Sequence, residues 1–273
     1  MARRGENGKM SRIFSAQDRQ DAYDFILSVT RKCGSIVALV QVGSGAEGFR
    51  DERSDLDYVI ALDSDDSMAK VMDYMSGKLS GKYEIAFSAR NESRHLQNFI
   101  LSNLLEIDLG YGGYEHAAAM KPAFKVLYDH SGIVEEKMIR SREWMDDKIY
   151  GDKQKKDIEA ACQSVWIRLM HAAVAIHRGN TFRAIGELEY VRKQYIDLLG
   201  DRYRLESGLN REIDRLPEEE KTLIRSTFVN GESAEALWTG LLNLTRLVYQ
   251  ELEEYNLPVT QNMLHDYYSD LRS

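Results

Sequence analysis

Two aspartates follow a glycine-containing turn in the first half of this 273-residue chain. Gly43 and Ser44 come first, and after ten further residues Asp55 and Asp57 stand two apart, at the start of the apolar run 57–62. Residues two apart on a strand point to the same face, so both carboxylates can aim at one point. Two carboxylates at one point repel each other unless a cation lies between them, and the spacing therefore favours a divalent metal.

The turn itself favours a phosphate group beside that metal. Mg²⁺ binds through one or two carboxylates, water and the phosphate oxygens of a substrate. Backbone N–H groups just past a strand form an anion-binding nest, and the hydroxyl of Ser44 adds a donor. Gly45 and Gly48 keep the backbone close to whatever binds there. Arg50 and Arg53, in the same loop, could neutralise triphosphate charge or could be solvated loop residues.

Two other phosphate-binding motifs fit the sequence less well. A Walker loop is excluded because no G-x-x-x-x-G-K-[ST] occurs. Gly43, Gly45 and Gly48 formally satisfy the dinucleotide-binding pattern G-x-G-x-x-G. The acid of that motif lies about 20 residues beyond the glycines, at the end of a second strand. Here the acids lie closer, come as a pair and precede their strand, so the dinucleotide interpretation is disfavoured.

In-line transfer of a phosphoryl or nucleotidyl group calls for a third carboxylate. It would complete the metal site or take the proton from an attacking hydroxyl. Asp108 is the best candidate, as a lone acid in the apolar run 104–111, and Glu106 is the alternative two residues earlier on the same face. Glu187 and Glu189 are further candidates for the base, unless they simply lie on an exposed helix face.

The first half of the chain predicts a mixed sheet with flanking helices. A helix is expected over 15–34, with Ser15 as its N-cap and Asp18 near the positive end of its dipole. A second helix is expected over 66–78. Strands are expected over 35–42, 57–62, 82–89 and 96–111, the last as two strands joined at Ser102-Asn103, with 124–129 as a further or edge strand.

The second half predicts a bundle of amphipathic helices, because apolar residues recur there every three or four positions. Turns are expected near 178–180, 199–201 and 230–233. The predicted fold class is therefore α+β: a disordered leader over 1–14, a mixed α+β domain over 15–130 and an all-α helical domain over 131–273.

Composition narrows the classes of partner. The net charge is −8, so the basic surface expected of a nucleic-acid-binding protein is absent, and a cationic small molecule is the more natural partner. No apolar run approaches the roughly 18 residues that span a bilayer. Without an export signal we expect a cytoplasmic protein in which Cys33 and Cys162 are free thiols.

The segment VGSGAEGFRDERSDLDYVIAL resembles the signature of the DNA polymerase β-like nucleotidyltransferase superfamily. That signature is Gly-Ser, ten residues, Asp-x-Asp and an apolar strand, and the serine before the first aspartate also matches. The resemblance implies a triphosphate at the Gly-Ser turn and metal ions held by Asp55, Asp57 and Asp108. The residues that we expect to contact the nucleotide are Gly43, Ser44, Arg50 and Ser54.

The second half resembles, more loosely, the helical domain of antibiotic nucleotidyltransferases, chiefly over residues 178–199. Those enzymes attach AMP to a hydroxyl of an aminoglycoside or lincosamide. The resemblance implies Mg²⁺-dependent transfer of AMP, or another NMP, from ATP or another nucleoside triphosphate to a small-molecule hydroxyl. The helical domain would then bind the acceptor.

Two alternatives to a small-molecule enzyme remain open. The first is a protein-modifying adenylyltransferase of antitoxin type. Ribonuclease partners in such systems often carry Arg-x(4–6)-His in a helical domain, whereas the match here, Arg90 to His95, lies in the first domain. The second alternative is a nucleotide-binding protein without catalysis, against which the three carboxylates argue. His171 and His177 stand six apart, which is not the i, i+4 spacing of a shared metal site.

Overall fold

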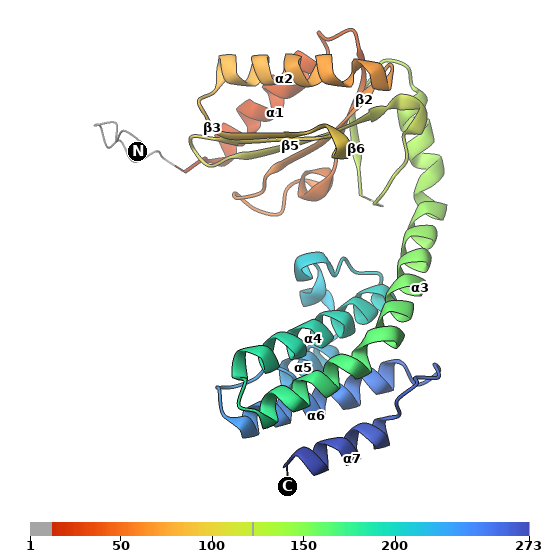
Figure 1. The fold of residues 1–273 in the computed structure, drawn as a ribbon. Coiled ribbons are helices and arrows are strands. Elements are labelled where there is room, and N and C mark those ends of the chain that lie inside the picture. Colours follow the sequence, from red (N-terminus) through yellow and green to blue (C-terminus); the bar gives the residue numbers. More distant parts are fainter. Residues whose placement is uncertain (1–12, 122, 273) are drawn as a thin grey trace, which may run out of the picture. The chain divides into compact units, whose positions relative to one another are not determined.

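The computed structural model describes residues 13–121 and 123–272, and the chain divides into two compact units between Asp146 and Asp147 (Figure 1). The first unit contains a mixed sheet with helices and the second is helical, which confirms the predicted α+β fold class. The expected leader lies outside the described residues except for its last two positions. None of the described helices is long and apolar enough to cross a membrane.

A six-stranded sheet forms the centre of the first unit, with the spatial order β3-β4-β5-β2-β1-β6. β2 and β5 are parallel neighbours, and the other neighbouring pairs are antiparallel. The segment 124–129 therefore pairs as an edge strand. The strands are β1 (Ile36–Gln41), β2 (Leu56–Leu62), β3 (Ile85–Asn91), β4 (Leu96–Leu101), β5 (Glu106–Gly113) and β6 (Lys125–Asp129).

Helices α1 (Ala16–Thr30) and α2 (Met68–Lys82) lie on the same side of the sheet (Figure 1). The predicted N-cap of α1 is confirmed: the Ser15 hydroxyl accepts the N–H of Asp18, whose carboxylate accepts the N–H of Ser15 at 2.7 Å. This capping box satisfies two N–H groups that the helix leaves unpaired. Buried side chains from both helices and the sheet form one core, among them Ile26, Leu39, Ile60 and Met72.

The first turns of α3 (Ile133–His177) pack with the opposite face of the sheet. Val134 and Met138 are buried against Val37 and Ala61. The hydroxyl of Ser141 accepts the N–H of Ala119 at 2.9 Å. The division between the two units consequently falls inside α3, after the segment that packs on the sheet.

The segment around β3 differs from the sequence prediction. The helix expected over 66–78 continues to Lys82, and the strand expected over 82–89 begins at Ile85. The alternation of apolar and polar residues over 82–89 predicts a half-buried strand, but most side chains of β3 are exposed, including Phe87 at 55%, so that prediction is wrong. β3 is the outermost strand of the sheet and pairs with β4 alone, and only partly buried side chains, Ile85 among them, pack against the core.

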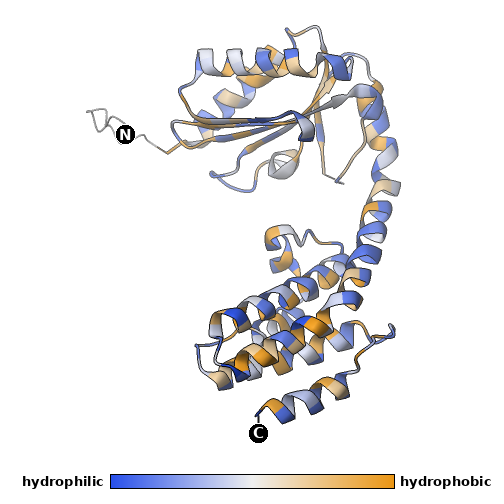
Figure 2. Ribbon diagram, viewed as in Figure 1, coloured by the Kyte–Doolittle hydropathy of each residue, from blue (hydrophilic) through white to orange (hydrophobic). Residues whose placement is uncertain are grey.

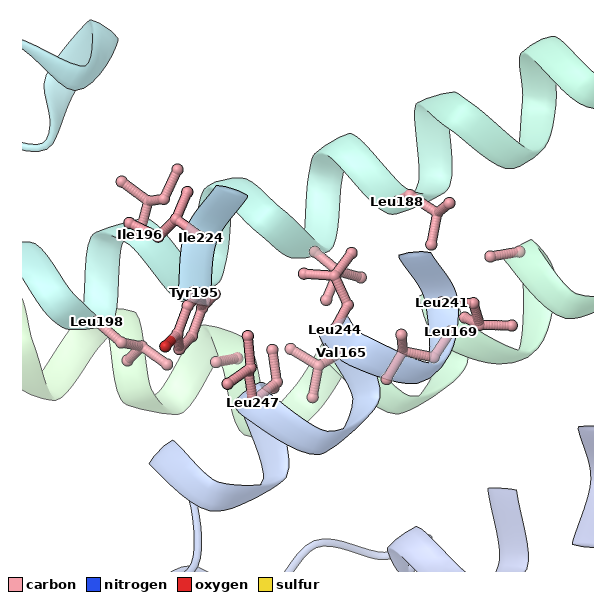
Figure 3. Packing of buried hydrophobic residues seen from close by; sticks show 14 of the residues in the cluster. Val165, Leu169, Leu188, Tyr195, Ile196, Leu198, Ile224, Leu241, Leu244 and Leu247 are labelled. Atoms are coloured by element: carbon pink, nitrogen blue, oxygen red, sulfur yellow. The ribbon is translucent and has the colours of Figure 1, made fainter. Parts of the chain in front are cut away.

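The second unit packs the rest of α3 with α4 (Thr181–Tyr203), α5 (Glu218–Ser226), α6 (Ala234–Glu251) and α7 (Gln261–Arg272). Apolar residues alternate with hydrophilic ones along these helices (Figure 2). The apolar ones form one continuous core (Figure 3), which includes Val165, Leu169, Leu188, Tyr195, Leu241, Leu244 and Leu247. Helical periodicity in the sequence thus predicted the buried face correctly.

The turn predicted at 199–201 is wrong, because α4 runs through Gly200 to Tyr203. A Cβ added at Gly200 would lie 2.8 Å from Cβ of Ser207 and 3.1 Å from the carbonyl oxygen of Leu205. The glycine therefore allows the returning chain to pack against the helix. The helix ends at Arg204, which adopts a left-handed conformation.

Two adjacent residues of β2 test this account of the sheet. Ile60 is fully buried beneath the helices, whereas Val59 points to the opposite face and is 39% exposed. We expect Ile60→Ala to lower the free energy of unfolding by about 2–5 kcal/mol, through lost apolar contacts and the cavity left behind. Val59→Ala should change it by less than about 1 kcal/mol. Urea denaturation of both variants measures the difference, and equal losses would contradict the assignment of faces.

Candidate active site

The parallel pairing of β2 and β5 places two of the predicted acids side by side. Asp57 is the direct register partner of Asp108. On each strand the flanking residues, such as Tyr58 and Leu109, are buried in the core under α1 and α2. Because side chains alternate along a strand, both half-buried aspartates point to the opposite face.

The loop that follows β1 lies directly against Asp57. Gly43 has a φ of +63°, and a Cβ added there would lie 2.2 Å from Oδ2 of Asp57. The N–H of Val42 donates to the carbonyl oxygen of Asp57 at 3.0 Å, which fixes the loop beside the strand. Glycine is therefore needed at this position twice, for its backbone conformation and for its close approach to the carboxylate.

The loop forms one turn of 3₁₀ helix, Gly43–Glu47, which ends at Gly48 in a left-handed conformation. The hydroxyl of Ser44 is buried without a hydrogen-bond partner among the described residues, and so is the Nε2 atom of Gln41. A Cβ added at Gly45 would lie 2.1 Å from that Nε2 atom. Buried polar atoms normally have partners, so two unpaired donors beside one loop indicate a place where a ligand or water can bind.

The second part of the loop is organised by hydrogen bonds. The Ser54 hydroxyl accepts the N–H groups of Arg50 and Asp51 at 3.1 and 3.3 Å. Arg19, a buried residue of α1, donates to the carbonyl oxygens of Asp51 and Ser54 at 2.7 and 3.2 Å. Its guanidinium also lies 4.0 Å from the ring centroid of Phe49. Ser54 and Arg19 thus hold the segment that precedes Asp55.

The two loop arginines that the sequence left undecided have different surroundings. Arg53 donates to the carbonyl oxygen of Phe14 at 2.6 Å and lies over the ring of that residue. Arg50 is exposed, and no ion pair of its side chain occurs among the described residues. Arg50 is therefore the one whose guanidinium is available to a ligand at this loop.

Asp108 has a neighbour that sequence analysis missed. Asn98 is its register partner on β4 and donates its side-chain amide to Oδ1 of Asp108 at 2.6 Å. This bond fixes the orientation of the carboxylate. The sequence offered no signal for Asn98, because its role depends on the order and register of β4 and β5.

Glu106 lies two residues before Asp108 on the same face of β5 and has an exposed side chain. Partial burial of its carboxyl group raises its pKa above the ordinary value, and the charges of Asp108 and Asp55 raise it further. Asp55, Glu106 and Asp108 thus lie close enough to interact electrostatically. Asp108 and Glu106, the two candidates for the third carboxylate, therefore lie near each other and near Asp55.

The residues of this neighbourhood fit a magnesium ion and phosphate by their chemistry. No group of three or more His, Cys, Asp and Glu side chains in the described part of the chain is arranged to hold a metal ion. Mg²⁺ typically binds through one or two carboxylates, with water and phosphate oxygens as its other ligands. Asp57 and Asp108 provide such a pair, and the unpartnered hydroxyl of Ser44 lies in the loop beside Asp57.

The two glutamates considered as bases in the second unit both have cationic neighbours there. Glu187 is only 11% exposed and lies near three nitrogen-bearing side chains, Arg168 at 3.2 Å and His171 and Arg183 at 3.8 Å. Glu189 pairs with Arg192, which is buried. Both carboxylates therefore have structural partners within their own unit.

Three tyrosines that could line a substrate pocket, and one of the two histidines considered from sequence, also have local contacts. Tyr111 is buried and donates its hydroxyl to Gln97 at 2.7 Å. Tyr114 packs against the apolar cluster at the start of α3, and Tyr190 lies under the guanidinium of Arg168. His177 contacts the carbonyl oxygen of Leu271 through Nδ1 at 2.7 Å. These contacts are those of ordinary packing.

Comparison with known proteins finds similarity in solved structures alone. No protein-family model and no curated protein matches the chain. An aminoglycoside 6-adenyltransferase from Bacillus subtilis is similar with a TM-score of 0.42 and 14% identity, over 95% of this chain and 99% of that one. A nucleotidyltransferase-like protein from Exiguobacterium sibiricum is similar with a TM-score of 0.41 and 11% identity, over 94% and 88%. TM-scores and identities of this size are too low to assign a function. Any functional argument for this chain must come from the geometry of the site.

The electrostatic interaction between Asp108 and Glu106 can be measured through the pKa of Glu106. Removing the negative charge in Asp108→Asn should lower the pKa of Glu106 toward its ordinary value, because the ionised form no longer faces that like charge. A carbon-13 NMR titration of the Glu106 carboxyl group measures the shift. Asp73→Asn, which removes an exposed acid of α2, is the matched control and should leave that pKa unchanged. The same pKa in wild type and Asp108→Asn would mean that the two acids do not interact.

Proposed function

We propose that this protein is a Mg²⁺-dependent nucleotidyltransferase that moves AMP, or another NMP, from a nucleoside triphosphate to a hydroxyl group of a small molecule. One observation supports it above the others. Asp57 and Asp108 are register partners on parallel strands, and the backbone of Gly43 lies against Asp57. Two carboxylates suited to a metal ion and a loop suited to phosphate therefore meet at the same end of the central strands.

In this proposal the loop after β1 holds the triphosphate. The hydroxyl of Ser44, which lacks a partner among the described residues, and the neighbouring backbone N–H groups donate to phosphate oxygens. The exposed guanidinium of Arg50 adds charge-assisted donors from the same loop. Ser54 acts indirectly, since its hydroxyl already accepts two N–H groups of the loop.

In this proposal Asp57 and Asp108 would hold the metal as a pair, and Asp55, the third ligand expected from the sequence, would have to move to join them, because the three are not arranged as a metal site in the described structure. When bound, Mg²⁺ supplies charge neutralisation of the phosphates and lowers the pKa of a coordinated hydroxyl group. Asn98 keeps the Asp108 carboxylate in one orientation through its amide. In this proposal Asp108 or Glu106 would accept the proton of the acceptor hydroxyl, which must leave as the new O–P bond forms and the bond to pyrophosphate breaks.

The acceptor is proposed to be a cationic small molecule of the aminoglycoside or lincosamide type. The chain carries a net charge of −8, which favours association with a cation over association with a nucleic acid. The loose resemblance of residues 178–199 to the helical domain of antibiotic nucleotidyltransferases points to the same class of acceptor.

Label transfer tests the proposal directly. ATP labelled at the α-phosphate, with Mg²⁺ and a panel of aminoglycosides and lincosamides, should yield a labelled acceptor and free pyrophosphate. Asp57→Asn should reduce the rate by roughly 10²–10³-fold, the usual effect of removing one group that stabilises transition-state charge. Asp63→Asn, an exposed acid just after β2, should leave the rate unchanged. No transfer from any of the four nucleoside triphosphates to any acceptor would refute the proposal.

A pair of glycine variants tests the contact between the loop and Asp57. Gly43→Ala would force its Cβ against Oδ2 of Asp57, whereas a Cβ at Gly48 would meet open space. Both positions have positive φ, so both variants should lose about 1–3 kcal/mol of stability from backbone strain. Gly43→Ala alone should lose label transfer, by about 100-fold, since an error of about 1 Å in placement has that effect.

Unfolding curves and rates measured on the same samples separate the two effects. If both variants lost transfer equally, the loss would reflect strain in the loop and not the position of Asp57.

A further inference from the structure

A pocket of about 400 Å³ lies between α6 and α7 in the second unit. This volume falls in the range of small-molecule sites, about 300–1,000 Å³. The apolar part of its lining is Leu242 and the buried ring of Tyr268. Its polar lining contains donors and no Asp or Glu: Asn243, Arg246, Gln261, His265, Ser269 and Arg272.

The two arginines of this pocket have no acidic partner in the described part of the chain. Residues 147–273 contain eleven arginines, of which eight form ion pairs and three have none with any described residue. The three are Arg178, Arg246 and Arg272. Arg272 instead lies 5.5 Å from the ring centroid of Trp238. Two of the three unpaired arginines therefore line the same pocket.

Contacts of other residues anchor the two helices that carry these arginines. The lining positions recur every three or four residues on α6 and on α7, so each helix contributes one face. The hydroxyl groups of Thr245 and Tyr268 lie 3.1 Å apart, within hydrogen-bond distance across the two helices. At the far end of α7, the carbonyl oxygen of Leu271 contacts Nδ1 of His177 at 2.7 Å. The basic groups thus converge on a pocket between two anchored helices.

We propose that this pocket binds a phosphate-type oxyanion, either free or as part of a small phosphorylated molecule. A guanidinium presents parallel N–H donors that match two oxygens of such an anion, and the pocket contains two guanidiniums. The amide of Gln261, one of whose two N–H groups faces Nε2 of His265 at 3.4 Å, can donate its other N–H to a remaining oxygen. The hydroxyl of Ser269 already donates to the carbonyl oxygen of His265 at 2.9 Å and is not counted among the donors. A carboxylate has only two oxygens and would leave several of these donors unused.

An extended nucleic acid fits the surface less well. Exposed Asp266 and Asp270 lie on the same helix as the basic lining residues and would repel a phosphate backbone that runs along α7. Nucleic-acid binding normally uses a continuous basic stripe. The ligand that the lining residues favour is therefore small, with its charge concentrated in one group.

Calorimetric titration of the full chain tests the proposal, with inorganic phosphate, glucose 1-phosphate and acetate as probes in buffer that contains EDTA. EDTA removes divalent metal, which suppresses phosphate binding at the carboxylate site of the first unit. One equivalent of inorganic phosphate or glucose 1-phosphate should bind, more weakly at high salt, and acetate at least tenfold more weakly. At least tenfold tighter binding of glucose 1-phosphate would identify a phosphorylated molecule as the ligand, and the reverse would identify free phosphate.

Arginine variants assign the binding to this pocket. Arg246→Gln should weaken it at least tenfold, and Arg272→Gln should do the same. Arg215→Gln removes the same charge from an exposed arginine paired with Glu212 and should bind as wild type does. Arg246 has no described hydrogen bond or ion pair, so Arg246→Gln should keep the wild-type melting temperature even if Arg272→Gln, which loses its contact with Trp238, does not.

Three results would overturn the proposal: no binding of either phosphate probe to the wild-type protein, unchanged binding in Arg246→Gln, or an equal loss in Arg215→Gln. The proposal does not rest on the nucleotidyltransferase activity. Label transfer depends on Asp57, and anion binding in EDTA depends on Arg246, so either property can fail alone.

Discussion

The parallel pairing of β2 with β5 is the constraint on which the candidate site depends. Asp57 and Asp108 both lie near the beginning of their strands, and parallel strands bring equivalent ends to one edge of the sheet. β1 is antiparallel to β2, so the loop that leaves β1 arrives at that same edge, where Gly43 meets Asp57. β4 is antiparallel to β5 and brings Asn98 to Asp108. The strand order and directions of β1, β2, β4 and β5 thus bring these side chains and the loop after β1 to one place.

That edge of the sheet contains several features that a purely structural sheet would avoid. Partial burial and the like charges of Asp108 and Asp55 together raise the pKa of Glu106. Ser44 and Gln41 have buried polar atoms without described partners, and Gly43 needs a left-handed backbone. Each feature lowers the stability of the fold by itself, and a cation with a phosphate would relieve the first two. Departures from good packing that cluster at one place are typical of functional sites.

The sequence predicted those parts of the site that are local in the chain. The glycines of the loop, the Asp55–Asp57 pair and the acid Asp108 within an apolar run could be found because each has a pattern within a few residues. Asn98 and Arg19 could not, since their roles depend on sheet register and on the contact of α1 with a distant loop. The turn predicted at Gly200 was wrong for a related reason. A glycine in a helical pattern can either end the helix or allow a neighbouring segment to pack closely against it. Only the contact with Ser207, which lies in a later segment, distinguishes the two cases.

The charges of the second unit lead to a complementary argument about binding. An exposed ion pair contributes about 0–1 kcal/mol, so stability alone does not require every arginine to have an acidic partner. The effect on ligand binding is larger, because an anion that approaches a paired arginine must compete with the carboxylate already there. Eight arginines of this unit are paired with an Asp or Glu, so an anion would have to compete with that carboxylate. Arg246 and Arg272 have no acidic partner among the described residues, and the residues that line their pocket include no Asp or Glu in that part of the chain. Even in a chain with a net charge of −8, an anion can therefore be attracted locally, since the nearest charges matter most when salt screens the distant ones beyond about 10 Å.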